Sequence, residues 1–271
     1  MSERDGFPHG VPCWVECLTP DPAATGRFYA SMFGWQLEGS GPLPGDGREY
    51  LVARLRDREV AGVAPLPPAD AAGEVSPAWF TQVRVDDADA AAERVRAAGG
   101  SVIAGPMDLP PVGRLVVLED PSGARIGAFQ PTGRGGAELV NEPGAWSMSA
   151  LVGADPAAAA AFYGAVFGWD AEEWQGVTLF RLPGFVGGEP AQPVPRDVVA
   201  VGMPGDGPAR WDVDFWTDDA DRVAATAAER GGRVLVAPHE RAGFRSVVVA
   251  DPAGATFSAS QLLAAPAPAD G

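Results

Sequence analysis

Three carboxylates on segments with β-strand character are the best candidates for acid–base chemistry. Glu16 lies two residues after Trp14 in the segment 12–19, so both side chains share one face of that strand. A carboxylate that faces an apolar interior without a partner has a raised pKa and can act as a general acid or base, or can anchor a ligand. The alternative is that Glu16 pairs with an arginine such as Arg84 or faces solvent.

Asp212 and Asp214 form the second acidic feature. They alternate along one strand with Val213 and Phe215, and they share a face with Trp216. An acidic face of this kind can hold a cationic or hydroxyl-rich ligand, or it can separate two pKa values for acid–base work. An exposed strand face would show the same pattern, so the sequence leaves both interpretations open.

Neutral and aromatic side chains surround these carboxylates in the sequence pattern. Gln82 follows Phe80 by two residues and offers both a hydrogen-bond donor and an acceptor on the same face. The chain has eight tryptophans, and several aromatic residues occupy strand positions expected to face a cavity: Trp14, Trp79 or Phe80, Trp211 and Trp216. Aromatic walls with few polar groups are typical of a pocket for a flat or hydrophobic molecule. Core packing is the alternative.

The sequence lacks the residue sets that several other kinds of catalytic or binding site require. The only histidines, His9 and His239, lie in an amino-terminal extension and in a predicted loop. No Gly-rich phosphate loop, Ser/His/Asp set or Cys/His pair is present. Cys13 and Cys17 are too far apart along one strand for easy bridging, so we expect free thiols.

Charge and composition narrow the class of protein. The formal net charge is −16 and the pI is about 4.4, which disfavours nucleic acid and anionic membranes as partners. Apolar residues form 46% of the chain and charged residues 21%, as in ordinary globular proteins. No apolar run approaches the roughly 20 residues of a membrane span, and the first residues lack the apolar stretch of a signal peptide. We therefore expect a cytoplasmic protein.

The sequence contains an internal duplication. The motif Phe-Tyr-x-x-x-Phe-Gly-Trp at residues 28–35 returns at residues 162–169, and two further blocks recur in the same order at nearly the same spacing. The duplication predicts domains at residues 10–131 and 145–263. We interpret the Gly-rich segment 132–144 as a linker and the tail 264–271 as disordered.

Each half is expected to contain two units of strand, helix and three strands. In the first unit, Asp21-Pro22 supplies a helix start and Gly34 a left-handed helix end. Short β-like runs separated by Gly and Pro turns follow each predicted helix. The four units span residues 12–68, 79–131, 145–195 and 211–263, which gives an α+β fold.

The paired βαβββ units, the motif at 28–35 and the Asp-Pro-x-Gly run before the last strand of each half resemble the vicinal-oxygen-chelate (VOC) superfamily. This superfamily includes the glyoxalase, bleomycin-resistance and extradiol-dioxygenase families. The likeness covers about residues 10–262 and is strongest to two-domain glyoxalase-like proteins of actinobacteria, several of them labelled hydroxylases. The resemblance implies that each pair of units curls into a half-open barrel around a ligand cavity.

The resemblance also implies where a metal would bind. Metal-using members carry His, His or Gln, and Glu at three interior positions. The corresponding residues here are Trp14, Phe80 and Gly127 in the first domain, and Met148, Asp212 and Ser258 in the second. Only Asp212 is a plausible ligand, and one carboxylate is too few for a tight site. We therefore expect no metal and no other cofactor.

The leading hypothesis is a metal-independent, glyoxalase- or bleomycin-resistance-like protein that binds an aromatic small molecule. It would either sequester a drug or modify a natural product in a hydroxylase-like way. The catalytic candidates are Glu16, Asp212 and Asp214, and the ligand-binding candidates are Trp14, Phe80, Gln82, Met148, Trp216 and Ser258. A divalent-metal lyase, isomerase or dioxygenase is the alternative, and a duplicate that binds a protein partner is a third. Monomer and homodimer are both compatible with the sequence.

Overall fold

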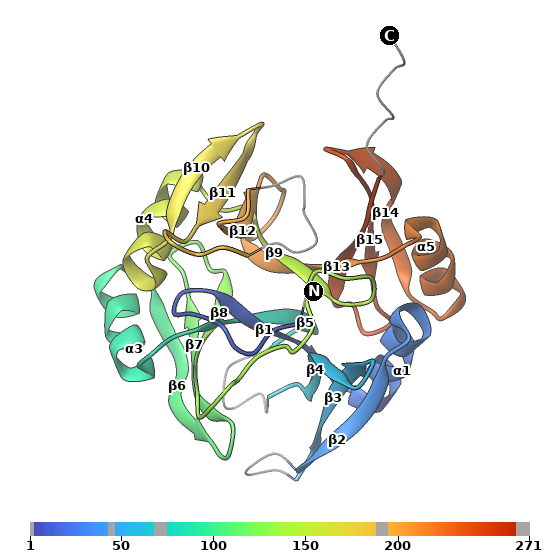
Figure 1. Cartoon of the computed structure of the whole chain (residues 1–271), viewed down its shortest axis with the longest axis horizontal. Helices are drawn as coiled ribbons and strands as arrows, with labels where there is room; N and C mark the ends of the chain where they lie inside the picture. The colour runs from blue at the N-terminus through green and yellow to red at the C-terminus, as the bar shows by residue number, and fades with distance from the viewer. Residues whose placement is uncertain (1–2, 43–46, 68–74, 188–194, 264–271) are drawn as a thin grey trace.

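The computed structural model describes residues 3–42, 47–67, 75–187 and 195–263. These residues form two eight-stranded sheets, each accompanied by helices (Figure 1). The tail 264–271, interpreted as disordered from its composition, lies outside the described residues. No helix in the described parts of the chain is both long and apolar enough to cross a lipid bilayer.

The first sheet, with its helices, is domain 1. Its strand order is β2-β3-β4-β1-β5-β8-β7-β6. Strand β1 pairs in parallel with β4 and antiparallel with β5, and β5 pairs in parallel with β8, so the first strands of the two units lie side by side at the centre. The elements are β1 (Pro12–Thr19), α1 (Pro22–Phe33), β2 (Gln36–Pro42), β3 (Glu49–Leu55), β4 (Arg58–Pro65), β5 (Ala78–Arg84), α3 (Ala88–Ala97), β6 (Ser101–Leu109), β7 (Gly113–Glu119) and β8 (Arg125–Pro131).

The second sheet, domain 2, repeats this topology in the order β10-β11-β12-β9-β13-β16-β15-β14. The paired βαβββ units and the α+β half-open barrels predicted from the sequence are confirmed. The elements are β9 (Trp146–Val152), α4 (Pro156–Phe167), β10 (Asp170–Trp174), β11 (Val177–Arg181), β12 (Val198–Met203), β13 (Arg210–Trp216), α5 (Ala220–Glu229), β14 (Arg233–Arg241), β15 (Phe244–Ala250) and β16 (Thr256–Leu262).

Local sequence signals fix the ends of the first helix of each domain. The Asp21 side chain accepts a hydrogen bond from the Ala24 backbone N–H at 2.9 Å, and Pro22 occupies the first helical turn. Gly34 ends α1 with a φ of 72°, a left-handed conformation that glycine adopts without a steric penalty. In α4 the same roles fall to Asp155 and Gly168.

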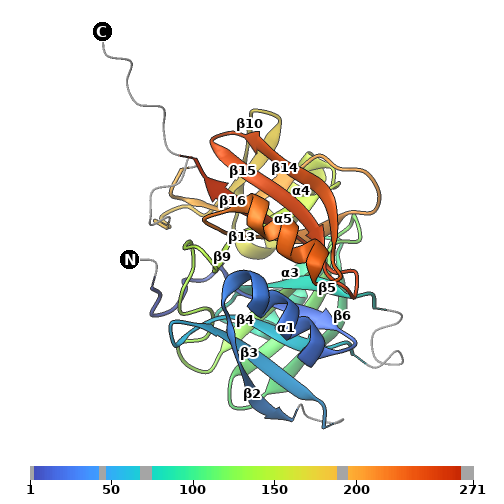
Figure 2. The same ribbon diagram turned by 90° about the vertical axis from the view of Figure 1, so that its right-hand side faces the viewer.

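The two domains pack against each other through their helices. Helix α1 of domain 1 contacts α5 of domain 2, and α3 contacts α4 (Figures 1 and 2). The first unit therefore meets the fourth, and the second unit meets the third. Each contact has its own buried core, in which β1, α1 and Trp79 join β13, α5 and β16, while β5, β8 and α3 join α4 and Trp211.

The tyrosine of the repeated motif forms a buried hydrogen bond between the domains. Tyr163 of α4 donates to Asp120 Oδ2 at 2.8 Å, and the Trp211 indole N–H donates to the Tyr163 hydroxyl at 2.9 Å. Asp120 belongs to the Asp-Pro-x-Gly turn, and its other oxygen accepts the Ala124 N–H. Asp120 therefore both closes the turn and binds the other domain.

The contact between the first and fourth units has the same arrangement, with the tyrosine now in domain 1 and the aspartate in domain 2. Tyr29 of α1 donates to Asp251 Oδ2 at 3.1 Å and accepts the Trp79 indole N–H at 2.9 Å. Trp35 and Trp169, the last residues of the motif, donate to carbonyl oxygens of the opposite domain's leading segment, at Gly144 and Gly10 respectively.

Two expectations from the sequence need correction, and one choice is decided. Trp211 faces the interdomain core and not a cavity. Of the alternatives Trp79 and Phe80, Trp79 belongs to the interdomain core and Phe80 pairs with Glu16 on the interior face. His239 lies within strand β14 and not in a loop, because that strand extends over nine residues. The expectation of free thiols at Cys13 and Cys17 is confirmed.

The segment between the domains is packed against the rest of the protein. Ala137, Leu139 and Val140 are buried in the interdomain core, and the Ala137 N–H donates to the Cys13 carbonyl at 2.8 Å. Gly136 has a φ of 101°, and a Cβ at this position would lie 2.7 Å from the Cys13 carbonyl oxygen. The glycines of this segment therefore permit close packing as well as turns.

The interdomain tyrosines predict a measurable effect on stability. Tyr163→Phe removes the bond to buried Asp120 and leaves the Trp211 N–H without its acceptor, so we expect the free energy of unfolding to fall by about 2–3 kcal/mol. Tyr29→Phe, its counterpart, should have a similar effect. Urea unfolding measures both. A loss below about 0.5 kcal/mol, the size of an ordinary surface change, would contradict this role.

Candidate functional site

Asp214 lies at the centre of a hydroxyl network on the interior face of domain 2. Its Oδ2 accepts the Ser147 hydroxyl, and its Oδ1 accepts the hydroxyls of Ser258 and Ser260, all at 2.7 Å. Burial raises the pKa of the Asp214 carboxyl, while the three serine bonds oppose that shift. Ser246 extends the network, because its hydroxyl lies 2.8 Å from that of Ser260.

Asp212 shares the strand and the face but has different partners. Arg210 Nε lies 3.1 Å from Asp212 Oδ2, and the Thr256 hydroxyl donates to Oδ1 at 3.1 Å. Burial raises the pKa of Asp212, and the Arg210 charge lowers it. The two carboxylates are therefore held by different means, one by a cation and one by hydroxyls. Asp214 is not the exposed residue that the alternative interpretation required.

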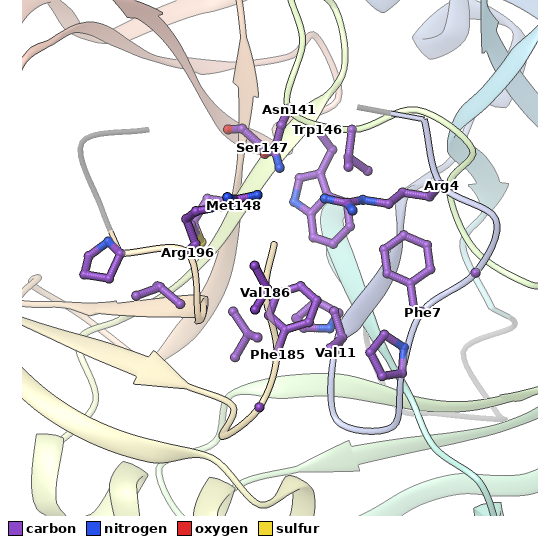
Figure 3. Close-up of a pocket in the computed structure, with 18 residues that line it drawn as sticks. Arg4, Phe7, Val11, Asn141, Trp146, Ser147, Met148, Phe185, Val186 and Arg196 are labelled. Carbon is purple, nitrogen blue, oxygen red and sulfur yellow. The ribbon is translucent and has the colours of Figure 1, made fainter. Parts of the chain in front are cut away.

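A pocket of about 340 Å³ opens beside this network (Figure 3). This pocket, called the domain 2 pocket, lies between the amino-terminal segment 4–12, residues 140–141, strand β9, residues 184–186 and residues 195–199. Ser147, which donates to Asp214, is one of its lining residues, so the carboxylate lies one hydrogen bond behind the pocket wall. Its described lining also includes the side chains of Arg4, Phe7, Asn141, Trp146, Met148, Phe185 and Arg196.

The interior face of domain 1 carries a hydrogen-bonded chain of three side chains. The Trp14 indole N–H donates to the Tyr50 hydroxyl at 2.8 Å, and that hydroxyl donates to Glu16 Oε2 at 2.8 Å. Glu16 is only 8% exposed, and burial raises its pKa, while hydrogen bonds from Tyr50, Gln82 and Trp14 oppose the shift. Glu16 thus neither faces solvent nor depends on Arg84, which bonds Asp86.

Tyr50 is a part of this site that sequence reasoning missed. It lies over Gly62, where a Cβ would come within 1.9 Å of the Tyr50 hydroxyl oxygen and 3.0 Å of the Glu16 Cβ. Gly62 pairs with Glu16 across β4 and β1, so a residue without a side chain leaves the room that Tyr50 fills. The sequence of β3 does not predict the contact between Tyr50 and Glu16, because this contact depends on the pairing of β4 with β1.

The sequence-predicted residues fall into two groups, one in each domain. Trp14 pairs with Gln82, and Glu16 with Phe80, so these four side chains share the interior face of domain 1. Asp214 pairs with Met148 and with Ser258 on the interior face of domain 2, and strand alternation adds Asp212 and Trp216. Among these sequence-predicted residues, Met148 is the one that occurs in the described lining of the domain 2 pocket.

The interior positions do not fit a metal. In domain 1 they hold two aromatic rings and a glycine, and a Cβ on Gly127 would lie 2.9 Å from the Phe80 ring. In domain 2 they hold a thioether, a hydroxyl and Asp212, which is engaged by Arg210. Among the residues that the structure describes, no three His, Cys, Asp or Glu side chains cluster in a way that could hold an ion.

Sequence reasoning also missed most of the domain 2 pocket. Arg4 and Phe7 come from the amino-terminal extension, Asn141 from the segment interpreted as a linker, and Arg196 from the chain before β12. The sequence offers only a weak indication that these segments line a pocket. An aromatic residue and a short apolar run lie in segments that are otherwise rich in Gly and Pro.

Comparison with known proteins identifies the family. Residues 14–127 match the model of the Glyoxalase/Bleomycin resistance protein/Dioxygenase superfamily, and residues 148–260 match that of the Glyoxalase-like domain. The chain belongs to this superfamily. It is 37% identical over 265 residues to the "Putative glyoxylase CFP32" of Mycobacterium tuberculosis, with 95% of this chain and 97% of the relative covered.

Two further relatives are named for anthracycline biosynthesis. The chain is 31% identical to the anthracycline biosynthesis protein DauV of Streptomyces sp. (strain C5), with 98% of each chain covered. It is also 31% identical to the anthracycline biosynthesis protein DnrV of Streptomyces peucetius, with 94% of each covered.

Solved structures share the fold. The Mn(II)-bound glyoxalase from Novosphingobium aromaticivorans has a TM-score of 0.62 at 17% identity, covering 94% of this chain and 83% of that one. The 2,3-dioxygenase LapB from Pseudomonas sp. KL28 has a TM-score of 0.62 at 13% identity, covering 96% and 95%. At these identities the likeness supports the superfamily fold and not a shared site.

The raised pKa of Glu16 predicts a pH-dependent stability. Because the folded state holds this proton more tightly than the unfolded chain, stability is lost as the pH rises from the ordinary value of 4.5 through the folded pKa. Glu16→Gln mimics the protonated form, so the variant should not lose this stability as the pH rises. The unfolding free energy of the variant relative to the parent should therefore increase from pH 4 to pH 8. A constant or decreasing difference in urea unfolding would contradict the assignment.

Proposed function

We propose that this protein binds an aromatic or hydrophobic small molecule in the domain 2 pocket and that it does so without a resident metal. The observation that carries the proposal is the pocket itself, an opening of about 340 Å³ whose lining combines aromatic and aliphatic side chains with polar ones. Ligand pockets of roughly 300–1,000 Å³ with mostly apolar linings and a few polar groups are typical of small-molecule sites. Phe7 and Phe185 provide aromatic surface, and Met148 an adaptable thioether.

The relatives support a natural-product ligand. The two relatives named for anthracycline biosynthesis match over almost the whole chain. We extend from them only the general class of ligand, a flat polycyclic molecule, which suits the aromatic and aliphatic walls of the pocket. Either sequestration or chemical modification of such a molecule is consistent with this binding role.

Proton transfer is the chemistry that the chain's own side chains offer to a bound ligand. Asp214 lies behind Ser147, so a proton can pass between the carboxyl and a ligand oxygen through one hydroxyl. Its raised pKa keeps more of the protonated form than an exposed aspartate would have. Asp212 and, in domain 1, Glu16 remain further proposed acid–base groups. Trp14, Phe80, Gln82, Trp216 and Ser258 remain proposed ligand contacts on the two interior faces.

The absence of a resident metal is proposed from the donor chemistry. The positions where metal-using members carry imidazole and carboxylate hold Trp14, Phe80 and Gly127 in domain 1. Asp212 is the only hard ligand at the domain 2 positions, and Arg210 engages it. Binding and proton transfer by this protein are therefore proposed to depend on its own side chains.

The test is a binding screen with a variant that fills the pocket. Equilibrium dialysis or tryptophan quenching against aromatic polyketides and bleomycin-like compounds should find a binder, and Met148→Trp should weaken its affinity at least tenfold by occupying the cavity. Leu235→Trp, on the exposed face of β14, is the matched control and should bind like the parent. No binder in the panel, or equal affinity in the Met148 variant, would count against the pocket.

A further inference from the structure

We propose that domain 2 has a second ligand site, which takes a small apolar molecule that carries an ammonium group. The site is an opening of about 320 Å³ between the start of helix α4, the hairpin of β10 and β11, and the end of β12. It is called the helix-side pocket. Two observations carry the proposal: side-chain volume that domain 1 has and domain 2 lacks, and a pair of polar side chains in an otherwise apolar lining.

The helix-side pocket and the domain 2 pocket lie on opposite faces of the second sheet. Leu151 and Phe180 line the helix-side pocket and belong to the core between the domains. Met148, three residues before Leu151 on β9, points to the other face and lines the domain 2 pocket. Ala159 lines the helix-side pocket from α4, which lies beside β10 and β11 in Figure 1. A molecule bound here therefore lies outside the barrel interior.

The strands of domain 2 have less side-chain volume at this place than those of domain 1. Leu51 pairs with Val63 in domain 1, and the corresponding pair in domain 2 is Thr178 and Gly202. The correspondence follows from the register, because Val63 is aligned with β1 in the same way as Gly202 is with β9. Thr178 and Gly202 both line the pocket, and both are smaller than their counterparts.

The helix adds to this difference in volume. Thr25 of α1 is the fourth residue after the N-cap Asp21, and its hydroxyl lies 2.7 Å from that of Thr19. Both threonines are buried. Ala159 and Gly153 occupy the two positions in domain 2. The space that two threonine side chains fill between helix and strand in domain 1 therefore receives only one methyl group in domain 2.

Larger residues close the inner side of the pocket. Leu151 and Phe180 stand where domain 1 has Cys17 and Ala53, and both are almost fully buried. The opening remains outside them. Apolar cavities of roughly 150 Å³ stay free of water and bind benzene. The helix-side pocket therefore has room for a ring with a short side chain.

Glu173 and Thr178 supply the polar part of the lining. They face each other across β10 and β11, so their side chains are neighbours on the face that carries the pocket. Thr178 is only 8% exposed. Among the described residues, the Thr178 hydroxyl forms no hydrogen bond and the Glu173 carboxylate forms no ion pair. A carboxylate beside a hydroxyl offers acceptors to the N–H groups of an ammonium ion.

The charges around Glu173 also favour a cation. None of the described lining residues is basic. Arg181 bonds the neighbouring Glu172 at 2.9 Å, but both lie on the opposite face of the hairpin. Glu173 is exposed, and an exposed ion pair contributes little free energy, so the apolar walls supply most of the affinity. The carboxylate determines the preference for an ammonium group over a neutral one.

The test compares two probes of equal size, 2-phenylethylamine and 2-phenylethanol, by ligand-observed NMR titration at neutral pH. We expect the parent protein to bind the amine with a dissociation constant of about 1 mM or tighter, and about threefold more tightly than the alcohol. Glu173→Gln should bind the two probes equally. Glu229→Gln, which removes the same charge from the exposed end of α5, is the matched control and should keep the preference.

Two further variants fill the pocket. Ala159→Leu adds bulk from the helix, and Thr178→Leu restores the residue that domain 1 has at the same position. Each should weaken the binding of both probes about tenfold or more, and urea unfolding checks that each variant is folded. Ala161→Leu, on the exposed face of α4, is the matched control and should bind like the parent.

Met148→Trp, which fills the domain 2 pocket, should leave the affinity for the amine unchanged. Loss of binding in this variant would place the probe in the domain 2 pocket and overturn the second site. No saturable binding to the parent, or parent-like binding by both filled variants, would also overturn it. Equal affinity of the amine and the alcohol in the parent would overturn the ammonium assignment. The binding screen of the proposed function concerns the other pocket, so failure of one site is distinguishable from failure of the other.

Discussion

Reciprocal packing of the two domains through buried tyrosine–aspartate hydrogen bonds is the constraint on which the rest of the structure depends. Tyr29 reaches Asp251 and Tyr163 reaches Asp120, so each domain's first helix is tied to a turn in the other domain. The alternate residues of the central strands, such as Val15 on β1 and Phe215 on β13, fill the core between the domains. A slip of one residue in either strand would exchange core and interior residues, so the interdomain core also determines which side chains face each barrel interior.

The two interior faces have diverged although the duplication gave them one topology. In domain 1, the Trp14, Tyr50 and Glu16 chain lies on the interior face beside Phe80, and Glu16 is buried. In domain 2, hydroxyls surround Asp214 and a pocket opens next to them. The described interior face of domain 1 is therefore organised around a Trp–Tyr–Glu chain, and that of domain 2 around an aspartate held by serine hydroxyls.

Sequence alone predicted the repeat, the caps of the helices and the grouping of side chains on strand faces, because these follow from local periodicity. Trp14 and Glu16 share a face for the same reason that Asp212 and Asp214 do, and the structure agrees with both groupings. Alternation does not say which face meets another domain. For that reason the sequence left Trp211 open between a cavity wall and core packing, and the structure places it in the interdomain core. The Tyr50 partner of Glu16 and the pocket donors from Arg4 and Asn141 arise from contacts between distant segments, which no local pattern encodes.

The central claim, that this superfamily member binds an aromatic ligand with its own side chains and without a metal, has one direct test. The protein, purified without chelators, would be crystallised in the presence of Mn²⁺ and a polycyclic aromatic compound, and anomalous difference maps would locate any bound metal. The account predicts ligand density between Phe7 and Phe185 and no manganese peak in either barrel. A cation coordinated by three or more protein atoms inside a barrel would contradict it.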